Sequence, residues 1–151
     1  MNEFTIFEKE MKSYSEFLMT KNYHFKEYSI FSGNPAIRFI YSNNVLNKVI
    51  TFDFSPSYGS IIQSRITVII SNLTTNQAID ISMLLAYLEK NDRVTWQDQS
   101  KYFFRFDSDN ISESIHEVLL QISDVLENEA KSIFTTNDWF AIPIHDPRDD
   151  Y

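Results

Sequence analysis

The chain has 151 residues, a formal net charge of −8, no cysteine and two glycines. A chain of this length usually forms one domain and can bury a core without cross-links. The absence of cysteine excludes disulfides and thiolate sites and fits a reducing cytosol, and two glycines are too few for a glycine-rich phosphate loop. Hydrophobic residues make up 43% and aromatic residues 15% of the chain, which argues against intrinsic disorder.

The sequence shows no targeting or membrane-spanning segment. Its first residues lack the basic stretch and apolar run of a secretory signal. The longest apolar stretch, residues 83–88, is far shorter than the ~20 residues that a membrane-spanning helix requires. We therefore expect a cytoplasmic protein.

The first element is predicted to be an amphipathic helix over residues 3–21. Thr5 and Glu8 have the spacing of a capping box, and Asn22 suits the end of the helix. The apolar stripe recurs at three- and four-residue spacing: it consists of Phe4, Phe7, Met11, Tyr14 and Leu18.

Four strands are predicted next, because the chain becomes rich in β-branched and aromatic residues broken by turn-forming clusters. Apolar residues alternate along them, as in Ile37, Phe39 and Tyr41, which places one face of each strand on a core. Their short connections require antiparallel neighbours. The expected strands are 23–31, 36–42, 46–54 and 61–71.

The second half is predicted to contain two helices with a hairpin between them. Thr74 with Gln77 and Asn110 with Glu113 have capping-box spacing, which predicts helices at about 75–90 and 110–131. Segments 93–96 and 102–106 are expected to pair as a short hairpin. The predicted fold is a single α+β domain over 1–151 in the order α-β-β-β-β-α-β-β-α, with helices packed on an antiparallel sheet and 132–151 as a C-terminal extension.

Negative charge is concentrated in the last third of the chain. Residues 1–105 carry 11 Lys and Arg and 10 Asp and Glu, whereas residues 106–151 carry 2 and 11. An ordinary solvated helix interleaves both signs, and unpaired like charge costs stability by self-repulsion. We expect this surface to attract a basic protein and to repel nucleic acid and anionic membranes.

The predicted partner-binding residues are the acids on and around the last helix, together with two tail aromatics. Solvation of a surface helix is the alternative explanation, and Asp107, Asp109 and Glu113 would also complement the dipole at its N-terminus. The full predicted set is Asp107, Asp109, Glu113, Glu117, Asp124, Glu127, Asp138, Trp139, Asp146, Asp149, Asp150 and Tyr151.

The tail around Trp139 allows two interpretations. Trp139, Phe140 and Ile142 can dock on the core as a final extended segment, or they can anchor a partner. Aromatic residues beside charged ones are typical of interface hot spots, so Trp139 and Tyr151 are the first candidates if the tail binds a partner.

No catalytic or metal-binding pattern stands out. His145 with Asp146, Asp149 and Asp150 could in principle ligate a divalent ion, but one histidine without a second spaced ligand is a weak signal. No serine lies in a nucleophile elbow. We expect a non-enzymatic protein without metal or cofactor.

A family resemblance lies in segments 37–43 (IRFIYSN), 49–55 (VITFDFS) and 66–70 (ITVII), preceded by Phe17-Leu18 and Tyr23. This part of the chain resembles small bacterial immunity proteins encoded beside polymorphic or contact-dependent-inhibition toxins. The resemblance covers about half of the chain. It implies a cytosolic inhibitor that binds a cognate toxin domain, often a basic nuclease, and it transfers no binding residue to this sequence.

The element order and acidic composition are also similar to class I type III secretion chaperones, which are dimers that hold an effector segment. An extra strand before the middle helix and a tail after the last helix depart from that pattern. An immunity protein with an acidic docking face is the first hypothesis and a chaperone or adaptor the alternative, with monomer or homodimer left open.

Overall fold

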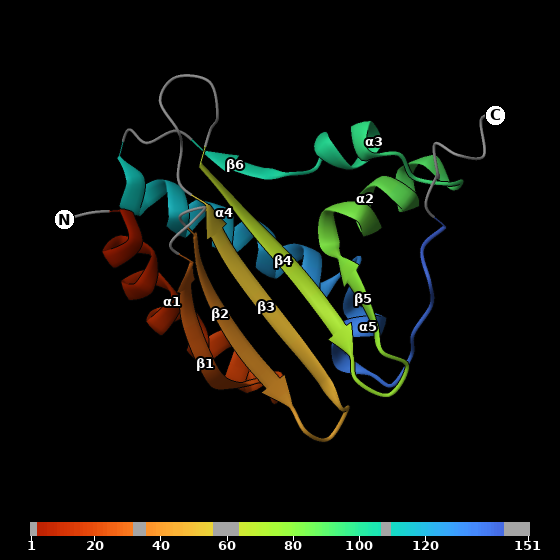
Figure 1. Ribbon diagram of the computed structural model, residues 1–151, viewed down its shortest axis with the longest axis horizontal. Helices are drawn as coiled ribbons and strands as arrows, with labels where there is room; N and C mark the ends of the chain where they lie inside the picture. Colours follow the sequence, from red (N-terminus) through yellow and green to blue (C-terminus); the bar gives the residue numbers. More distant parts are fainter. Residues whose placement is uncertain (1–2, 32–35, 56–63, 107–109, 144–151) are drawn as a thin grey trace.

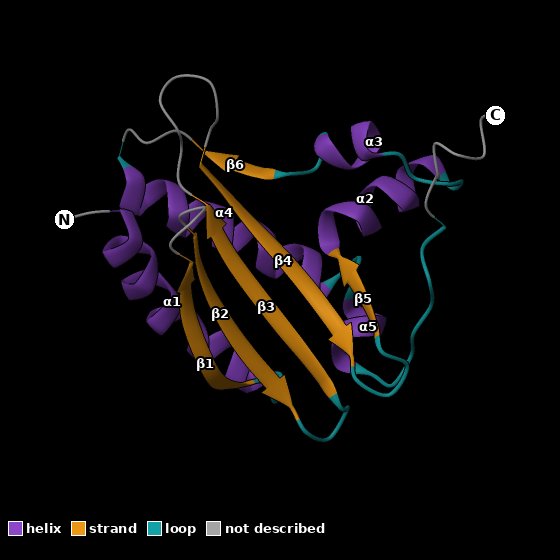
Figure 2. Ribbon diagram, viewed as in Figure 1, coloured by secondary structure: helices purple, strands orange, loops and turns teal. Residues whose placement is uncertain are grey.

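The computed structural model describes residues 3–31, 36–55, 64–106 and 110–143. This part of the chain contains five helices and six strands in the order α1-β1-β2-β3-β4-β5-α2-α3-β6-α4-α5 (Figures 1 and 2). The helices are α1 (Glu3–Thr20), α2 (Ile81–Lys90), α3 (Trp96–Ser100), α4 (Ile111–Glu127) and α5 (Lys131–Thr135). The strands are β1 (His24–Phe31), β2 (Ala36–Asn43), β3 (Lys48–Ser55), β4 (Ser64–Asn72), β5 (Gln77–Asp80) and β6 (Phe104–Phe106).

All six strands form one antiparallel sheet with the order β1-β2-β3-β4-β5, and β6 pairs with β4. Helices α1, α4 and α5 lie on one face, α2 and α3 lie beside the β4–β5 end, and no described helix covers the opposite face (Figure 1). The register places Phe39, Phe52 and Val68 opposite one another. Since side chains alternate between faces, this row and its neighbours two residues away form the floor of the core.

The core closes because the helices present apolar stripes to this floor. Phe7 and Met11 of α1 and Ile115 and Ile122 of α4 are fully buried. Phe7 also stacks on Phe54, with ring centroids 4.9 Å apart, so α1 is anchored on β3 by aromatic packing.

Two hairpin turns share one asparagine-based design. Asn43 and Asn72 each accept hydrogen bonds from the backbone N–H groups two and three residues ahead. Asn47 and Asn76, four residues further on, have left-handed φ values of 55° and 57°. Asparagine tolerates this conformation, so the chain makes these turns without glycine.

The α+β fold predicted from the sequence is confirmed, and so are the first helix and the four following strands within a few residues. Asn22, with a φ of 67°, ends the first helix as expected. Thr5 lies within the first turn of this helix and is therefore not its N-cap residue, because the helix already includes Glu3.

The predicted start of the second helix is wrong. Residues 77–80 form β5 instead, because the turn at Asn72 and Asn76 returns the chain antiparallel to β4. The helix begins at Ile81, where the side chain of Asp80 accepts a hydrogen bond from the Ser82 backbone N–H at 2.9 Å. Such a cap gives an acceptor to a backbone N–H of the first turn, which has no acceptor within the helix.

The predicted 93–96/102–106 hairpin is also wrong. Residues 96–100 form helix α3, and β6 pairs with β4. The Val94 N–H donates to Pro143 O at 2.9 Å, so that strand-like segment pairs with the C-terminal chain. The helix predicted over 110–131 ends at Glu127. Its N-cap residue is Asn110, whose side chain accepts no hydrogen bond from the first-turn backbone.

Among the described residues, no helix combines the length and apolar character needed to cross a membrane.

Candidate functional site

Helices α1 and α4 run side by side in the same direction and form a groove on the outer side of the helix layer. Near one end, the Ser112 hydroxyl donates to Glu10 Oε1 at 3.1 Å. At the other end, Lys21 Nζ lies 3.5 Å from Glu127 Oε1. These contacts link the helices at both ends and fix the groove between them.

The groove has a volume of about 620 Å³, and its floor is apolar. Tyr14 and Phe17 contribute from α1, and Leu119 and Leu120 contribute from α4. The Ser123 hydroxyl donates to the Tyr14 hydroxyl at 2.9 Å across the floor, and burial raises the pKa of Tyr14. Leu120 is 54% exposed, so an apolar side chain faces solvent here.

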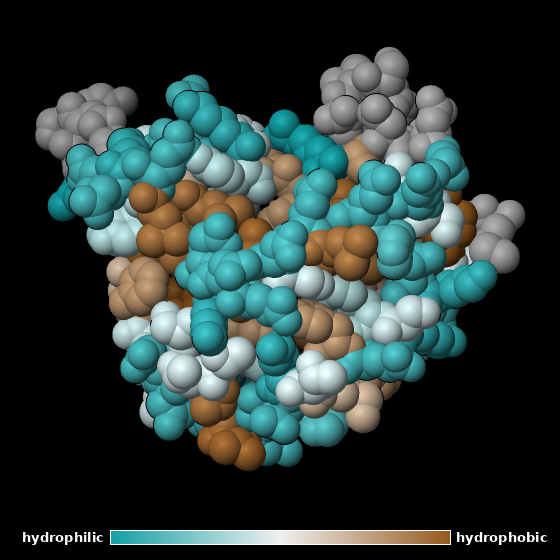
Figure 3. Space-filling view, turned by 180° about the vertical axis from the view of Figure 1, so that it is seen from behind, coloured by the Kyte–Doolittle hydropathy of each residue, from teal (hydrophilic) through white to brown (hydrophobic). Residues whose placement is uncertain are grey.

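Carboxylates line both sides of this apolar floor. Glu10 and Glu16 belong to the α1 side, and Asp124 and Glu127 belong to the α4 side. His116 Nδ1 lies 3.6 Å from Glu10 Oε2 at one end. Figure 3 shows the side of the molecule opposite to that of Figure 1, where hydrophobic patches lie among hydrophilic side chains. The groove therefore joins apolar surface to negative charge.

An acidic stripe continues from the groove along the outside of α4. Glu113, Glu117, Leu120 and Asp124 follow at four- and three-residue spacing, which places them on one side of the helix. The three acids are exposed. Within the described part of the chain, none of the three lies within ion-pair distance of a lysine or arginine. Glu113 does accept a short hydrogen bond from the Asn110 side-chain amide.

Two acids of α4, Asp124 and Glu127, lie at the end of the helix where negative charge is unfavourable. A helix C-terminus carries partial negative charge, so carboxylates in the last turn destabilise the helix and cations stabilise it. Asp124 and Glu127 occupy the last turn of α4, which contains no basic residue. Glu127 pairs with Lys21, the residue after α1, whereas Asp124 has no basic partner within the described residues. The helix dipole therefore does not explain these two positions.

The chain after α4 packs back on the body of the protein as far as the structure describes it. Ile133 and Phe134 of α5 are fully buried, and Ile142 is 8% exposed. Trp139 Nε1 donates to Gln77 Oε1 at 2.8 Å. Of the three residues considered for docking, Ile142 is buried and Trp139 is partly buried against the core, whereas Phe140 is 38% exposed. Through residue 143 the tail thus lies on the body of the protein, and Trp139 lies away from the α1–α4 groove.

The predicted site residues divide into three groups. Glu113, Glu117, Asp124 and Glu127 are brought together along α4. Asp138 and Trp139 lie in the segment that docks beside β3 and β5, and the Asp138 backbone carbonyl accepts a hydrogen bond from Lys48 at 3.0 Å. The others are outside the described residues: Asp107, Asp109, Asp146, Asp149, Asp150 and Tyr151.

The sequence interpretation missed the α1 side of the groove. Glu10 and Glu16 belong to residues 1–105, where acidic and basic residues nearly balance, so composition gave no sign of them. Leu120 did carry a signal, because it is apolar, lies outside the core stripe of its helix and has acids on either side. In the structure Leu120 joins Tyr14, Phe17 and Leu119 in one apolar surface, and a contiguous apolar patch indicates a contact surface more specifically than the acids alone.

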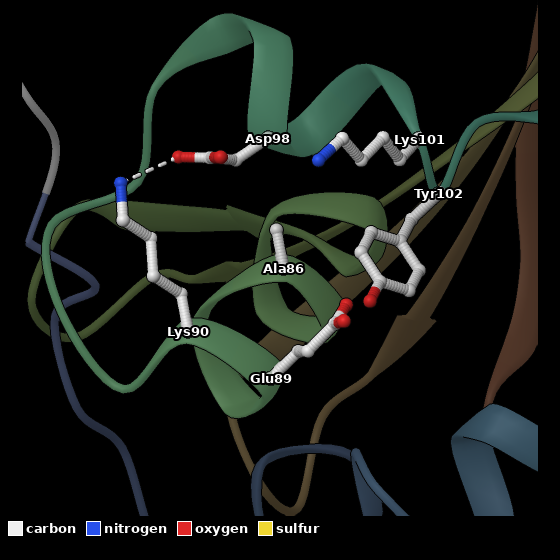
Figure 4. Close-up of a pocket in the computed structure, with 6 residues that line it drawn as sticks. All are labelled: Ala86, Glu89, Lys90, Asp98, Lys101 and Tyr102. Carbon is white, nitrogen blue, oxygen red and sulfur yellow. Dashed lines mark hydrogen bonds and ion pairs between the residues drawn. The ribbon is translucent and has the colours of Figure 1, made fainter.

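A second hollow of about 310 Å³ lies between α2 and α3 (Figure 4). Its lining carries charges of both signs, and Lys90 Nζ binds Asp98 Oδ2 at 2.8 Å. Lys101 and Glu89 add one further charge of each sign. Because these charges balance, the hollow shows neither the acidic character nor the apolar floor of the α1–α4 groove.

Within the described ranges, no three His, Asp or Glu side chains are grouped as metal ligands. The possible metal-binding residues near His145 are outside these ranges. In the comparisons with known proteins, no protein-family model, curated protein or solved structure matches the chain.

Proposed function

We propose that this protein is a non-enzymatic, immunity-type inhibitor that binds and neutralises a basic toxin domain through α4 and the adjoining groove. The observation that carries the proposal is the position of Asp124 and Glu127. Both are in the helix turn where carboxylates are least favourable, both line an apolar groove, and Asp124 has no basic partner within the described residues, whereas Glu127 has Lys21. A partner that supplies positive charge would compensate this cost.

Simple solvation explains the same surface less well. Some acids elsewhere on the protein have a basic partner, as in the Arg38–Asp53 pair at 2.7 Å and the Lys90–Asp98 pair at 2.8 Å, whereas Glu117 and Asp124 have none within the described part of the chain. Solvation also gives no reason for the contiguous apolar floor beside these acids. A basic, partly apolar ligand accounts for both features together.

The proposal is tested with the product of the neighbouring open reading frame. A toxin C-terminal domain encoded there should arrest growth when produced alone and should be neutralised when this protein is produced with it. The E117K/D124K variant should slow association by roughly tenfold or more at low salt, since electrostatic steering governs the on-rate. Association is measured by stopped-flow fluorescence.

The matched control is E89K/D92K, which changes the net charge equally at exposed acids away from α4. It should associate at nearly the wild-type rate. Association that is independent of salt and unaffected by E117K/D124K would remove this surface from the mechanism.

The second candidate is a chaperone that holds a secreted effector. Phe25, Tyr28 and Ile30 of the edge strand β1 are each more than half exposed, at 52%, 52% and 61%. An apolar row on a sheet edge suits a dimer partner or an extended segment. Light scattering separates the candidates, because an obligate chaperone should be a dimer, whereas the inhibitor requires no second copy.

A further inference from the structure

We propose that the α1–α4 groove receives an amphipathic α-helix of the partner, with an apolar stripe toward the floor and Lys or Arg along both edges of that stripe. This inference rests on the proposed function, because it specifies what the acidic surface binds. It goes further by assigning the secondary structure and side-chain pattern of the bound segment.

The dimensions of the groove fit about three turns of helix. Its α4 side extends from His116 to Glu127, a distance of roughly 16 Å at the usual rise of about 1.5 Å per residue. The contacts at Glu10 and Lys21 tie the two helices together near its ends. A third helix laid between two neighbouring helices is a common way to bury an apolar stripe.

The distribution of charge favours a helix over an extended strand. Acids line both sides of the floor, with Glu10 and Glu16 on one side and Asp124 and Glu127 on the other. A helix can present an apolar stripe with a basic residue on each flank. A strand alternates between two faces, so its basic residues would point away from the groove whenever its apolar residues point into it.

A second copy of this chain fits the groove poorly. Its own α4 would bring Glu117 and Asp124 against the carboxylates of the groove, and like charges facing each other across an interface are costly. Charge complementarity therefore favours a basic partner over self-association.

The test uses three synthetic peptides of about 15 residues, a length at which isolated helices are marginal in water. All contain the same leucines and lysines. In the first, leucine recurs at helical spacing; in the second, leucine and lysine alternate; in the third, the order is scrambled. Binding to the full chain is followed by fluorescence anisotropy and peptide helicity by circular dichroism.

The helical peptide should bind at least about tenfold more tightly than the other two, a difference of 1.4 kcal/mol, and should gain helicity when bound. The L120D variant should weaken this binding by about tenfold, because a charge replaces apolar contact in the groove. V45D is the control, since Val45 is 85% exposed in the turn between β2 and β3. The substitution there should leave binding unchanged.

Equal binding of the alternating or scrambled peptide would overturn the helix assignment, as would binding that L120D does not weaken. These failures are distinguishable from failure of the proposed function. If toxin association still depends on Glu117 and Asp124 while the helical peptide fails, the acidic surface stands and the bound segment is not a helix. If toxin association does not depend on Glu117 and Asp124 and the helical peptide does not bind, both proposals are wrong.

Discussion

Lys48 lies almost wholly inside the protein, at 1% exposure, where its ammonium group needs acceptors for its three protons. It donates to the backbone carbonyls of Ile133 at 2.5 Å, Thr136 at 2.6 Å and Asp138 at 3.0 Å. Its nitrogen also lies 5.5 Å from the centroid of the Trp139 ring. Burial lowers the pKa of Lys48, opposed by the nearby Asp138 charge. One side chain thus fastens the C-terminal segment to the start of β3.

The K48M substitution should lower the free energy of unfolding by about 2–4 kcal/mol, because it removes one buried and two partly buried hydrogen bonds to carbonyls while nearly preserving side-chain volume. Guanidinium denaturation measures the difference. The control is K131M, which removes an exposed lysine from α5. Equal effects of the two substitutions would show that the three hydrogen bonds contribute little.

At the scale of the element, α3 shows how a helix of five residues is held in place. Thr95 Oγ1 accepts from the Asp98 backbone N–H at 3.1 Å, and Asp98 Oδ2 accepts from the Thr95 N–H at 2.9 Å. Lys90 adds a bond at 2.8 Å to the same carboxylate. The Lys90 ammonium, followed by the Thr95 donors, holds the pKa of Asp98 well below its usual range.

This pKa shift has a definite sign for stability. A carboxyl whose pKa is depressed by folding stabilises the protein above its unfolded pKa of about 3.9, and the contribution is lost as the pH falls from there toward the folded pKa. The D98N variant should therefore have a lower free energy of unfolding than wild type at pH 7, and this difference should become smaller below about pH 4. Urea denaturation at several pH values measures this, with E89Q as the control. A gap that does not change with pH would contradict it.

How far the sequence predicted the elements depends on how local their causes are. The first helix and β2 to β4 follow from the periodicity of residues that face the core. The predicted end of the 75–90 helix matches α2, but its predicted start is wrong, because Thr74 and Gln77 have capping-box spacing while Asn72 and Asn76 govern the turn. The predicted hairpin is wrong because Thr95 and Asp98, which have capping-box spacing in the sequence itself, begin helix α3 between its two segments.

At the scale of the whole molecule, the candidate site was predicted only in part. The α4 acids were visible as an imbalance in composition. The α1 side was not, because Glu10 and Glu16 acquire their role only when packing sets them opposite Asp124 and Glu127. Which residues share a groove is decided by tertiary contacts that no local pattern contains.

The whole-molecule charge pattern also predicts a gain in stability. The E117Q/D124N variant, which neutralises both acids, should have a free energy of unfolding about 0.3–1 kcal/mol higher at low salt. The substitutions relieve self-repulsion and remove a carboxylate from the C-terminal turn of α4. Thermal unfolding at low and high salt measures this, and salt should reduce the gain. Destabilisation by E117Q/D124N would mean that these acids serve the fold, contrary to the proposed function.

The contact between Tyr23 and Phe134 has a consequence for synthesis on the ribosome. Their rings stack with centroids 4.7 Å apart, and the Tyr23 hydroxyl donates to the Phe134 carbonyl at 2.8 Å, across 111 positions of the chain. A nascent chain that has emerged only through β4 lacks α4 and α5, and most of its sheet is still bare. Such an intermediate exposes apolar surface and is the stage at which chaperones would engage it.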